Sequence, residues 1–288
     1  MATVCVITGG GSGMGLSAAK FIGNDRIIVL TGRTESKLQK ACDELKTLGI
    51  DARFKTADTS SRQSVKELVG FATSLGEVVQ VINAAGVSPT MADPEKVLRI
   101  NALGTVYVNQ EFAKVMKAGS VIVDIASNSA YSLPGAMIKM VKPFYKWADK
   151  NEEKFLGVFL KLAGLMKDDY LSSGMAYAFS KNFVTWYAAK TAFDLGARGI
   201  RVCSLSPGLI ETAMGKAEVE HGGALIDVAC EQRMGKPDEL GYAIASVADL
   251  RNGYLAAVDV LVDGGSTRGN QEFRKDPLAA LKMMKGGN

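Results

Sequence analysis

Tyr177 and Lys181 are the two residues of this 288-residue chain whose types and spacing most directly suggest chemistry. They lie four positions apart in residues 175–181, a segment typical of a helix, so their side chains share one helical face. An ammonium group close to a phenol favours the phenolate and lowers the tyrosine pKa from about 10. Such a phenol can act as a general acid or base near neutral pH. Most Tyr/Lys pairs at this spacing are ordinary surface pairs. The elements around the pair must therefore show whether it has a catalytic role.

A glycine-rich loop near the N-terminus is suited to hold the phosphates of a dinucleotide. Residues 8–15 are Thr-Gly-Gly-Gly-Ser-Gly-Met-Gly, and they follow the apolar run 4–7 and precede a helix-like run from Leu16. This is the order strand, tight turn and helix start. Glycine allows backbone angles that a Cβ forbids and lets a phosphate approach N–H groups at a helix N-terminus. The alternative is a plain turn. The spacing T-G-x-x-x-G-x-G differs from the G-x-G-x-x-G fingerprint.

The end of the second strand-like run, residues 26–31, suggests which dinucleotide binds. In a dinucleotide fold an acid at this point bonds the ribose 2′-hydroxyl, whereas an arginine accommodates a 2′-phosphate. Gly32 and Arg33 follow the run, and no acid occurs before Glu35. A guanidinium pairs with a phosphate in a fork. The sequence therefore favours NADP(H), and NAD(H) remains the alternative if Arg33 is only a solvated charge.

Strand-like and helix-like segments alternate along the chain. The strand-like runs are 4–7, 26–31, 52–56, 78–83, 120–125, 201–205 and 258–262. This alternation predicts a single α/β domain with a doubly wound parallel sheet, whose ligand crevice lies at the carboxyl ends of the strands. Small residues follow the fourth run, at Asn83-Ala84-Ala85-Gly86, and leave room there for a flat ligand.

Composition argues against several other classes of protein. The net charge is +4 with both signs interspersed, which gives no reason to expect nucleic-acid binding. No run of about 18 apolar residues is present, so we expect no membrane span. The four cysteines lack C-x-x-C spacing and His221 is the only histidine, so we expect no metal site. The first strand starts too early for a signal peptide, and we expect a cytoplasmic protein.

These features occur in the order found in the short-chain dehydrogenase/reductase family, which the chain resembles over residues 1 to about 267. The matching positions are Thr8-Gly9…Gly13-x-Gly15, Asn83-Ala84-Ala85-Gly86, Asn101, Ser127, Tyr177-x-x-x-Lys181 and Pro207-Gly208. The resemblance implies a Rossmann-like fold. It also implies that Tyr177 gives a proton to a carbonyl oxygen while NADPH delivers hydride, and removes the alcohol's proton in reverse.

The same resemblance implies roles for other residues. Ser127 would polarise the carbonyl oxygen, Lys181 would also hold the nicotinamide ribose, and Asn101 would connect Lys181 to a water chain. Asp58 would contact the adenine, with Asn83 beside the adenosine ribose. The expected cofactor contacts are Thr8, Gly9, Gly11, Ser12, Gly13, Met14, Gly15, Arg33, Asp58, Thr59, Asn83, Ala84, Gly86, Tyr177, Lys181, Pro207, Gly208, Ile210 and Thr212. We expect His221 at the surface or substrate rim rather than as a catalyst.

The chain departs from the family pattern between Ser127 and Tyr177, which are fifty positions apart. We expect residues 132–174 to form a helical insertion before the catalytic tyrosine. Within it, four apolar residues recur at helical spacing, namely Phe155, Phe159, Leu162 and Met166. The insertion is either an extra helical pair packed on the domain or an apolar lid for a bulky substrate. In carbonyl reductases and some hydroxysteroid dehydrogenases, a similar insertion blocks the helix-on-helix dimer surface, so we expect a monomer or a dimer through another surface.

The combined expectation is one domain over residues 1–267 and a basic tail over 268–288, with room for a short helix at 278–284. We expect an NADP(H)-dependent oxidoreductase that interconverts a secondary alcohol and a ketone. We expect the substrate to be bulky and apolar, such as a hydroxysteroid or bile acid. A 3-oxoacyl thioester reductase and a non-catalytic NADP(H)-binding regulator are the alternatives, and the intact Asn101, Ser127, Tyr177 and Lys181 argue against the regulator.

Overall fold

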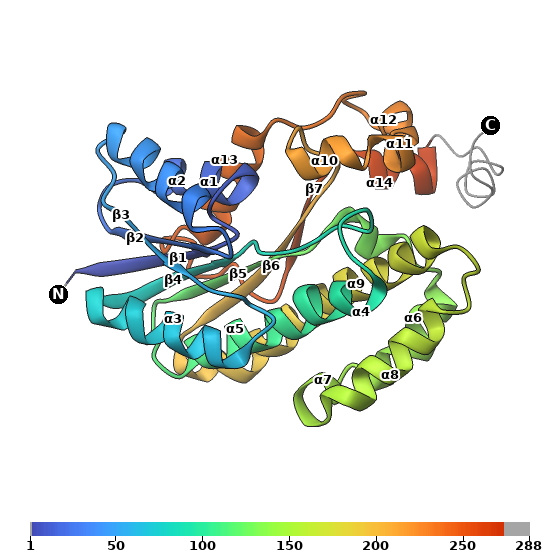
Figure 1. The fold of residues 1–288 in the computed structure, drawn as a ribbon, viewed down its shortest axis with the longest axis horizontal. Coiled ribbons are helices and arrows are strands. Elements are labelled where there is room, and N and C mark those ends of the chain that lie inside the picture. The colour runs from blue at the N-terminus through green and yellow to red at the C-terminus, as the bar shows by residue number, and fades with distance from the viewer. Residues whose placement is uncertain (1, 274–288) are drawn as a thin grey trace.

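One seven-stranded parallel sheet organises the molecule (Figure 1). The computed structural model describes residues 2–273. The strands are β1 (Thr3–Thr8), β2 (Ile27–Gly32), β3 (Ala52–Thr56), β4 (Glu77–Asn83), β5 (Val121–Ile125), β6 (Arg201–Pro207) and β7 (Asp259–Val262). Their order is β3-β2-β1-β4-β5-β6-β7. The predicted doubly wound sheet is confirmed, and the order reverses between β1 and β4, where a ligand crevice is expected.

Helices cover both faces of the sheet, and each face has its own apolar core. On one face lie α1 (Gly13–Ile22), α2 (Glu35–Thr47) and α13 (Pro237–Ala248). On the other lie α3 (Arg62–Leu75), α5 (Gly104–Ala113) and α9 (Asp169–Leu195), as Figure 1 shows. Because the inner strands are covered on both sides, their sequences are nearly continuous apolar runs.

The remaining helices are short, apart from one, and most lie at the carboxyl edge of the sheet or in the insertion. They are α4 (Pro94–Val97), α6 (Gly135–Val141), α7 (Trp147–Lys150), α8 (Glu152–Ala163), α10 (Ala213–Ala217), α11 (Val219–Gly222), α12 (Ala224–Val228) and α14 (Ser266–Arg268). Residues 94–113 are helical throughout, with a π-helical segment, Leu98–Leu103, between α4 and α5. No helix within residues 2–273 is long and apolar enough to cross a membrane.

The insertion packs on the domain through α8. Phe155 and Phe159 are fully buried, and their rings contact those of Phe183 and Phe179 on α9 at centroid distances of 5.1 and 5.3 Å. The periodic stripe that the sequence predicted is therefore core, not the wall of a substrate site. The stripe also stops earlier than predicted, since α8 ends at Ala163 and Met166 lies beyond it.

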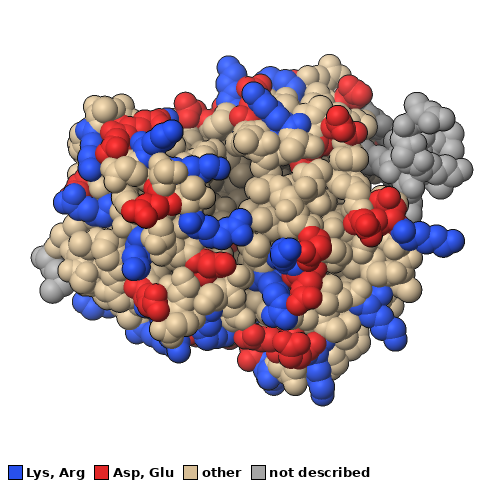
Figure 2. Space-filling model, in the orientation of Figure 1, with Lys and Arg blue, Asp and Glu red and all other residues tan. Residues whose placement is uncertain are grey.

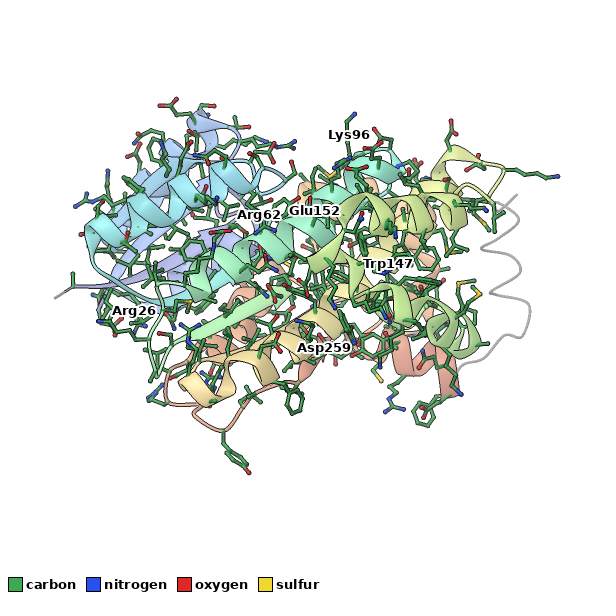
Figure 3. All side chains as sticks on the ribbon, turned by 90° about the horizontal axis from the view of Figure 1, so that it is seen from below. Arg26, Arg62, Lys96, Trp147, Glu152 and Asp259 are labelled. Atoms are coloured by element: carbon green, nitrogen blue, oxygen red, sulfur yellow. The ribbon has the colours of Figure 1, made fainter. Side chains whose placement is uncertain are left out.

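Polar contacts fix the start of α8 on the same face. Glu152 accepts a hydrogen bond from the Tyr107 hydroxyl at 2.6 Å and pairs with Arg62 of α3 at 3.5 Å. Figure 3 shows Arg62 and Glu152 lying side by side, with Trp147 of α7 beyond them. The insertion is thus held by α3, α5 and α9 together. Of the tail, α14 and a π-helical segment, Gly269–Phe273, are described, whereas the predicted helix at 278–284 lies outside the described residues.

Candidate active site

Two cavities meet at the carboxyl ends of the central strands. The first, of about 180 Å³, is lined by the glycine-rich loop and the end of β2, and we call it the glycine-loop cavity. The second, of about 310 Å³, is lined by Ser127, Tyr177 and Lys181, and we call it the tyrosine cavity. Gly86 and Val87 line both, so the cavities form one elongated crevice. Figure 2 shows a hollow at this edge of the molecule, bordered by lysine and arginine side chains.

The glycine loop has the geometry of a phosphate cradle. Gly9 and Gly13 have φ values of +67° and +58°, which favour glycine. A Cβ on Gly9 would lie 2.7 Å from the carbonyl oxygen of Ala84, and one on Gly15 would lie 2.8 Å from that of Gly9. Helix α1 begins at Gly13, so its unpaired N–H groups open on the loop. The loop thus fits the pyrophosphate of a dinucleotide.

Two cations lie at the far end of the glycine-loop cavity. Arg33 follows β2, as predicted, and its exposed side chain lines the cavity. Lys37, in the first turns of α2, lines it as well, and sequence reasoning missed this residue although it lies four positions after Arg33. Asp58 also lines this cavity, and its Oδ1 accepts hydrogen bonds from the Ser60 N–H and hydroxyl. Two cations next to a phosphate cradle suit a second phosphate group.

The structure brings most of the predicted cofactor contacts to the crevice. The glycine-loop cavity takes in Gly9, Gly11, Ser12, Arg33, Asp58, Thr59 and Gly86. The tyrosine cavity takes in Met14, Ala84, Gly86, Tyr177, Lys181, Pro207, Gly208, Ile210 and Thr212. Thr8 and Asn83 lie behind the wall, where the Thr8 hydroxyl donates to Asn83 Oδ1 at 2.8 Å. The Asn83 side chain is buried and its amide donates to Thr105 and Asp124. Its place beside the adenosine ribose stays a prediction.

Tyr177, Ser127 and Lys181 converge in the tyrosine cavity. Helix α9 carries Tyr177 and Lys181, and the Lys181 Nζ lies 5.6 Å from the Tyr177 ring centroid. The buried Lys181 ammonium donates to the carbonyl oxygen of Ile125 at 2.9 Å. Ser127 lies two residues past the end of β5, and its hydroxyl accepts the Ser129 N–H at 3.2 Å and donates to Asn128 Oδ1 at 3.3 Å. It also interacts with the Tyr177 hydroxyl and lowers the Tyr177 pKa. Two hydroxyls thus point at one place in the cavity, where a substrate oxygen can be bound.

The pKa of Tyr177 is raised, contrary to the lowering predicted from its neighbour Lys181. Burial is the largest cause, the Ser127 hydrogen bond opposes it, and the charge of Glu218 raises the pKa further. Burial also lowers the pKa of Lys181 to about 8, and the charge of Asp124 opposes that shift. The sequence argument counted the ammonium but not the loss of water around both groups. Tyr177 is therefore a protonated phenol near neutral pH, which is the form a proton donor needs.

Asn101 occupies the π-helical segment and holds the crevice wall in place. Its side chain accepts the Val87 N–H at 2.9 Å and donates to the Val87 carbonyl at 3.0 Å. It also donates to the Ser180 hydroxyl of α9 at 3.3 Å. Gly86 lies next to both Asn101 and Lys181, since a Cβ there would be 3.1 Å from Asn101 Oδ1 and 3.6 Å from Lys181 Nζ. The water chain that the resemblance implies for Asn101 stays a prediction.

A buried carboxylate lies close enough to Lys181 for their charges to interact. Asp124 of β5 is fully buried, and its two oxygens accept hydrogen bonds from the side-chain amides of Asn83 (3.2 Å) and Asn109 (2.7 Å). Burial raises the pKa of Asp124 to about 7, although these two bonds and the Lys181 charge oppose the shift. The folded state therefore binds a proton here that the unfolded state releases near pH 4, so this group makes stability fall as pH rises from about 4 to 7.

Asp124→Asn is expected to remove that loss of stability. The amide cannot ionise, and Asn109, whose Oδ1 is buried without a hydrogen-bond partner, can turn its oxygen toward the new amide. The variant should gain stability relative to wild type as pH rises from 5 to 8, by about 1.4 kcal/mol for each pKa unit removed. Urea unfolding at both pH values measures the gain. An equal stability difference at pH 5 and pH 8 would contradict the assignment.

The outer end of the tyrosine cavity carries polar residues that the sequence did not single out. Glu218 and Tyr170 line it, and no periodicity or motif around Glu218 marks it beforehand. His221 lines the same end, consistent with the rim position expected for it, and its ring stacks on that of Tyr170 at 3.7 Å. Within residues 2–273, no group of three or more His, Cys, Asp or Glu side chains is placed to hold a metal ion.

Two family models match adjoining parts of the chain. One, described as short chain dehydrogenase, matches residues 3–139, and one described as enoyl-(acyl carrier protein) reductase matches residues 135–267. The short-chain dehydrogenase/reductase bsc3 of Alternaria brassicicola is 29% identical over 272 residues, which cover 91% of this chain and 94% of the relative. A 3alpha-hydroxysteroid dehydrogenase of Mediterraneibacter gnavus is 26% identical over 272 residues, with 91% and 96% covered.

Solved structures share the fold. A short-chain dehydrogenase from Burkholderia cenocepacia J2315, solved in complex with NADP, superposes with a TM-score of 0.70. Its sequence is 23% identical, and the match covers 91% of this chain and 96% of that one.

Proposed function

The chain belongs to the short-chain dehydrogenase/reductase family, and we propose that it is an NADP(H)-dependent oxidoreductase that interconverts a ketone and a secondary alcohol. The observation that carries this proposal is the convergence of Ser127, Tyr177 and Lys181 in a cavity that continues into the glycine-loop cavity. A phosphate cradle and a proton donor at the two ends of one crevice suit hydride transfer from a bound dinucleotide.

Three residues of the tyrosine cavity have separate roles in carbonyl reduction. The dinucleotide, when bound, supplies the hydride. The Ser127 hydroxyl donates a hydrogen bond to the carbonyl oxygen and polarises it. Tyr177, protonated near neutral pH, passes its proton to that oxygen as negative charge develops there. The Lys181 ammonium stabilises the phenolate left behind. In alcohol oxidation the same phenolate removes the hydroxyl proton.

Arg33 and Lys37 support NADP(H) as the cofactor. Both line the glycine-loop cavity beyond the phosphate cradle, and Asp58 is the one acid that lines it with them in the part of the chain that the structure describes. The Asp58 carboxylate is already bonded to Ser60. A guanidinium and an ammonium at this end favour a 2′-phosphate over a bare ribose.

The walls of the tyrosine cavity support an apolar alicyclic substrate. Met14, Val87, Pro89, Ile125 and Met214 contribute apolar side chains around the hydroxyl pair. A hydroxysteroid, bile acids included, or another bulky ketone fits this lining, and one relative carries the name of a 3alpha-hydroxysteroid dehydrogenase. The insertion contributes Ser132, Tyr170 and Gly174 to the lining, so it borders the cavity without forming a lid from its apolar stripe.

The test is oxidation of NADPH, followed by absorbance, with a panel of steroid and cyclic ketones and one 3-oxoacyl thioester. We expect turnover of at least one cyclic ketone and faster turnover with NADPH than with NADH. Turnover confined to the thioester would support a thioester reductase instead. NADPH binding without turnover of any compound would support a non-catalytic regulator.

We also propose that the chain is a monomer, or a dimer that does not use the helix-on-helix surface of its relatives. Helix α8 packs along α9 and α4, and its Phe155 and Phe159 occupy that face within one chain. Because α8 already covers this face of α9, a second copy of the chain cannot pack against it. Sedimentation velocity should give a monomer or a dimer. A tetramer built on α9 would contradict the proposal.

A further inference from the structure

A carboxylate held by three hydrogen bonds lines the tyrosine cavity. Glu218 lies between α10 and α11, is half-buried and lines the same cavity as Tyr177. Its Oε1 accepts the Thr90 N–H at 3.2 Å and the Thr90 hydroxyl at 2.5 Å. Its Oε2 accepts the Tyr170 hydroxyl at 3.2 Å. Donors from two other segments, the loop after β4 and the start of α9, therefore hold this carboxylate in one position.

The three donors are neutral, so they orient the charge of Glu218 without cancelling it. That charge reaches the catalytic centre, because it raises the pKa of the Tyr177 phenol. Among the residues that the structure describes, the titratable groups that line the cavity with the phenol are Lys181 and Tyr170 on its own helix, Glu218, and His221 on α11. Lys181 donates to the Ile125 carbonyl, and Glu218 is the one carboxylate among the described residues that line the cavity.

We propose that Glu218 determines substrate specificity by charge, admitting neutral and cationic ketones and rejecting ketones that carry a carboxylate near the reacting group. This inference rests on the proposed function and narrows its substrate class. A carboxylate brought into a partly dehydrated apolar cavity beside Glu218 meets repulsion that water screens poorly. A hydrogen-bond donor or an ammonium in the same place meets an oxygen that still has a free lone pair.

The proposal divides the predicted substrates into two groups. Neutral hydroxysteroids and other neutral cyclic ketones belong to the accepted group. Acids whose carboxylate reaches the outer end of the cavity belong to the rejected group, and these include short oxo acids and any bile acid that enters with its side chain toward Glu218.

Competition with a neutral panel ketone in the NADPH-loaded enzyme at pH 8 tests the proposal. The readout is the alcohol formed from that ketone, measured separately from any alcohol formed from the probes. Three probes share one ring and differ in charge: 4-oxocyclohexanecarboxamide, 4-oxocyclohexanecarboxylate and 4-(dimethylamino)cyclohexanone. The amide and the carboxylate have nearly the same shape. In wild type we expect the amide to bind about tenfold more tightly than the carboxylate, and the amine at least as tightly as the amide.

Glu218→Gln keeps the shape and hydrogen-bonding capacity of the side chain but removes its charge. We expect it to reduce the amide-to-carboxylate preference to about threefold or less and to weaken binding of the amine. Glu220→Gln is the matched control, because Glu220 is an exposed residue of α11 that does not line the cavity, and it should keep the wild-type preference. Tyr170→Phe loosens the contact without removing charge and should keep most of the preference.

Equal inhibition by amide and carboxylate in wild type would overturn the proposal. So would a preference that Glu218→Gln leaves unchanged, or that Glu220→Gln removes equally. Failure of the proposed function has a different signature, since no panel ketone would then oxidise NADPH at all.

Discussion

Tyr177→Phe is expected to lower kcat for ketone reduction by about 10²–10⁴-fold while NADPH binding remains measurable. The substitution removes one oxygen, and with it the proton that the carbonyl oxygen takes up. The ring stays in place on α9, so the apolar contacts of the cavity are preserved. Steady-state kinetics with a panel ketone and fluorescence titration of NADPH measure the two effects separately.

Tyr254→Phe is the control for this prediction, because Tyr254 is fully exposed and lines neither cavity. It should leave kcat and NADPH affinity unchanged. Wild-type turnover in Tyr177→Phe would refute the assigned role of the phenol. Loss of NADPH binding together with turnover would instead indicate a structural role for Tyr177.

The sheet could be predicted from the sequence because its inner strands are buried on both faces. Each buried strand is a short apolar run, and the seven runs lie within a few residues of the seven strands observed. The cluster of Ser127, Tyr177 and Lys181 could be predicted for a related reason. Ser127 lies two residues past the end of β5 and the other two share a helical face, so the fold's topology brings them to one edge of the sheet.

Other features depend on packing between distant segments, which local patterns do not encode. The direction of the Tyr177 pKa shift follows from burial under residues far away in the chain. The insertion's apolar stripe could face either a ligand or α9, and periodicity is the same in both cases. Glu218 lies in the cavity because it bonds Thr90, 128 positions earlier in the sequence. None of these contacts has a spacing that marks it in advance.

Arg33→Ala is expected to weaken NADPH binding by about 10- to 100-fold and to leave NADH binding nearly unchanged. Hydrogen bonds between charged partners contribute about 1.5–3 kcal/mol each, which corresponds to that range. NADH lacks the 2′-phosphate, so it loses nothing when the guanidinium is removed. The ratio of kcat/KM for the two cofactors therefore isolates the contact with the phosphate from any general damage to the site.

Lys37→Ala should lower the same ratio by a smaller factor, because an ammonium makes a point contact where a guanidinium makes a fork. Lys40→Ala is its matched control, since Lys40 is an exposed residue of α2 that does not line the glycine-loop cavity. If Arg33→Ala weakens the binding of NADPH and NADH equally, Arg33 supports the loop and does not contact the 2′-phosphate. An unchanged ratio would leave Arg33 as a solvated strand-end charge and would remove the preference for NADP(H).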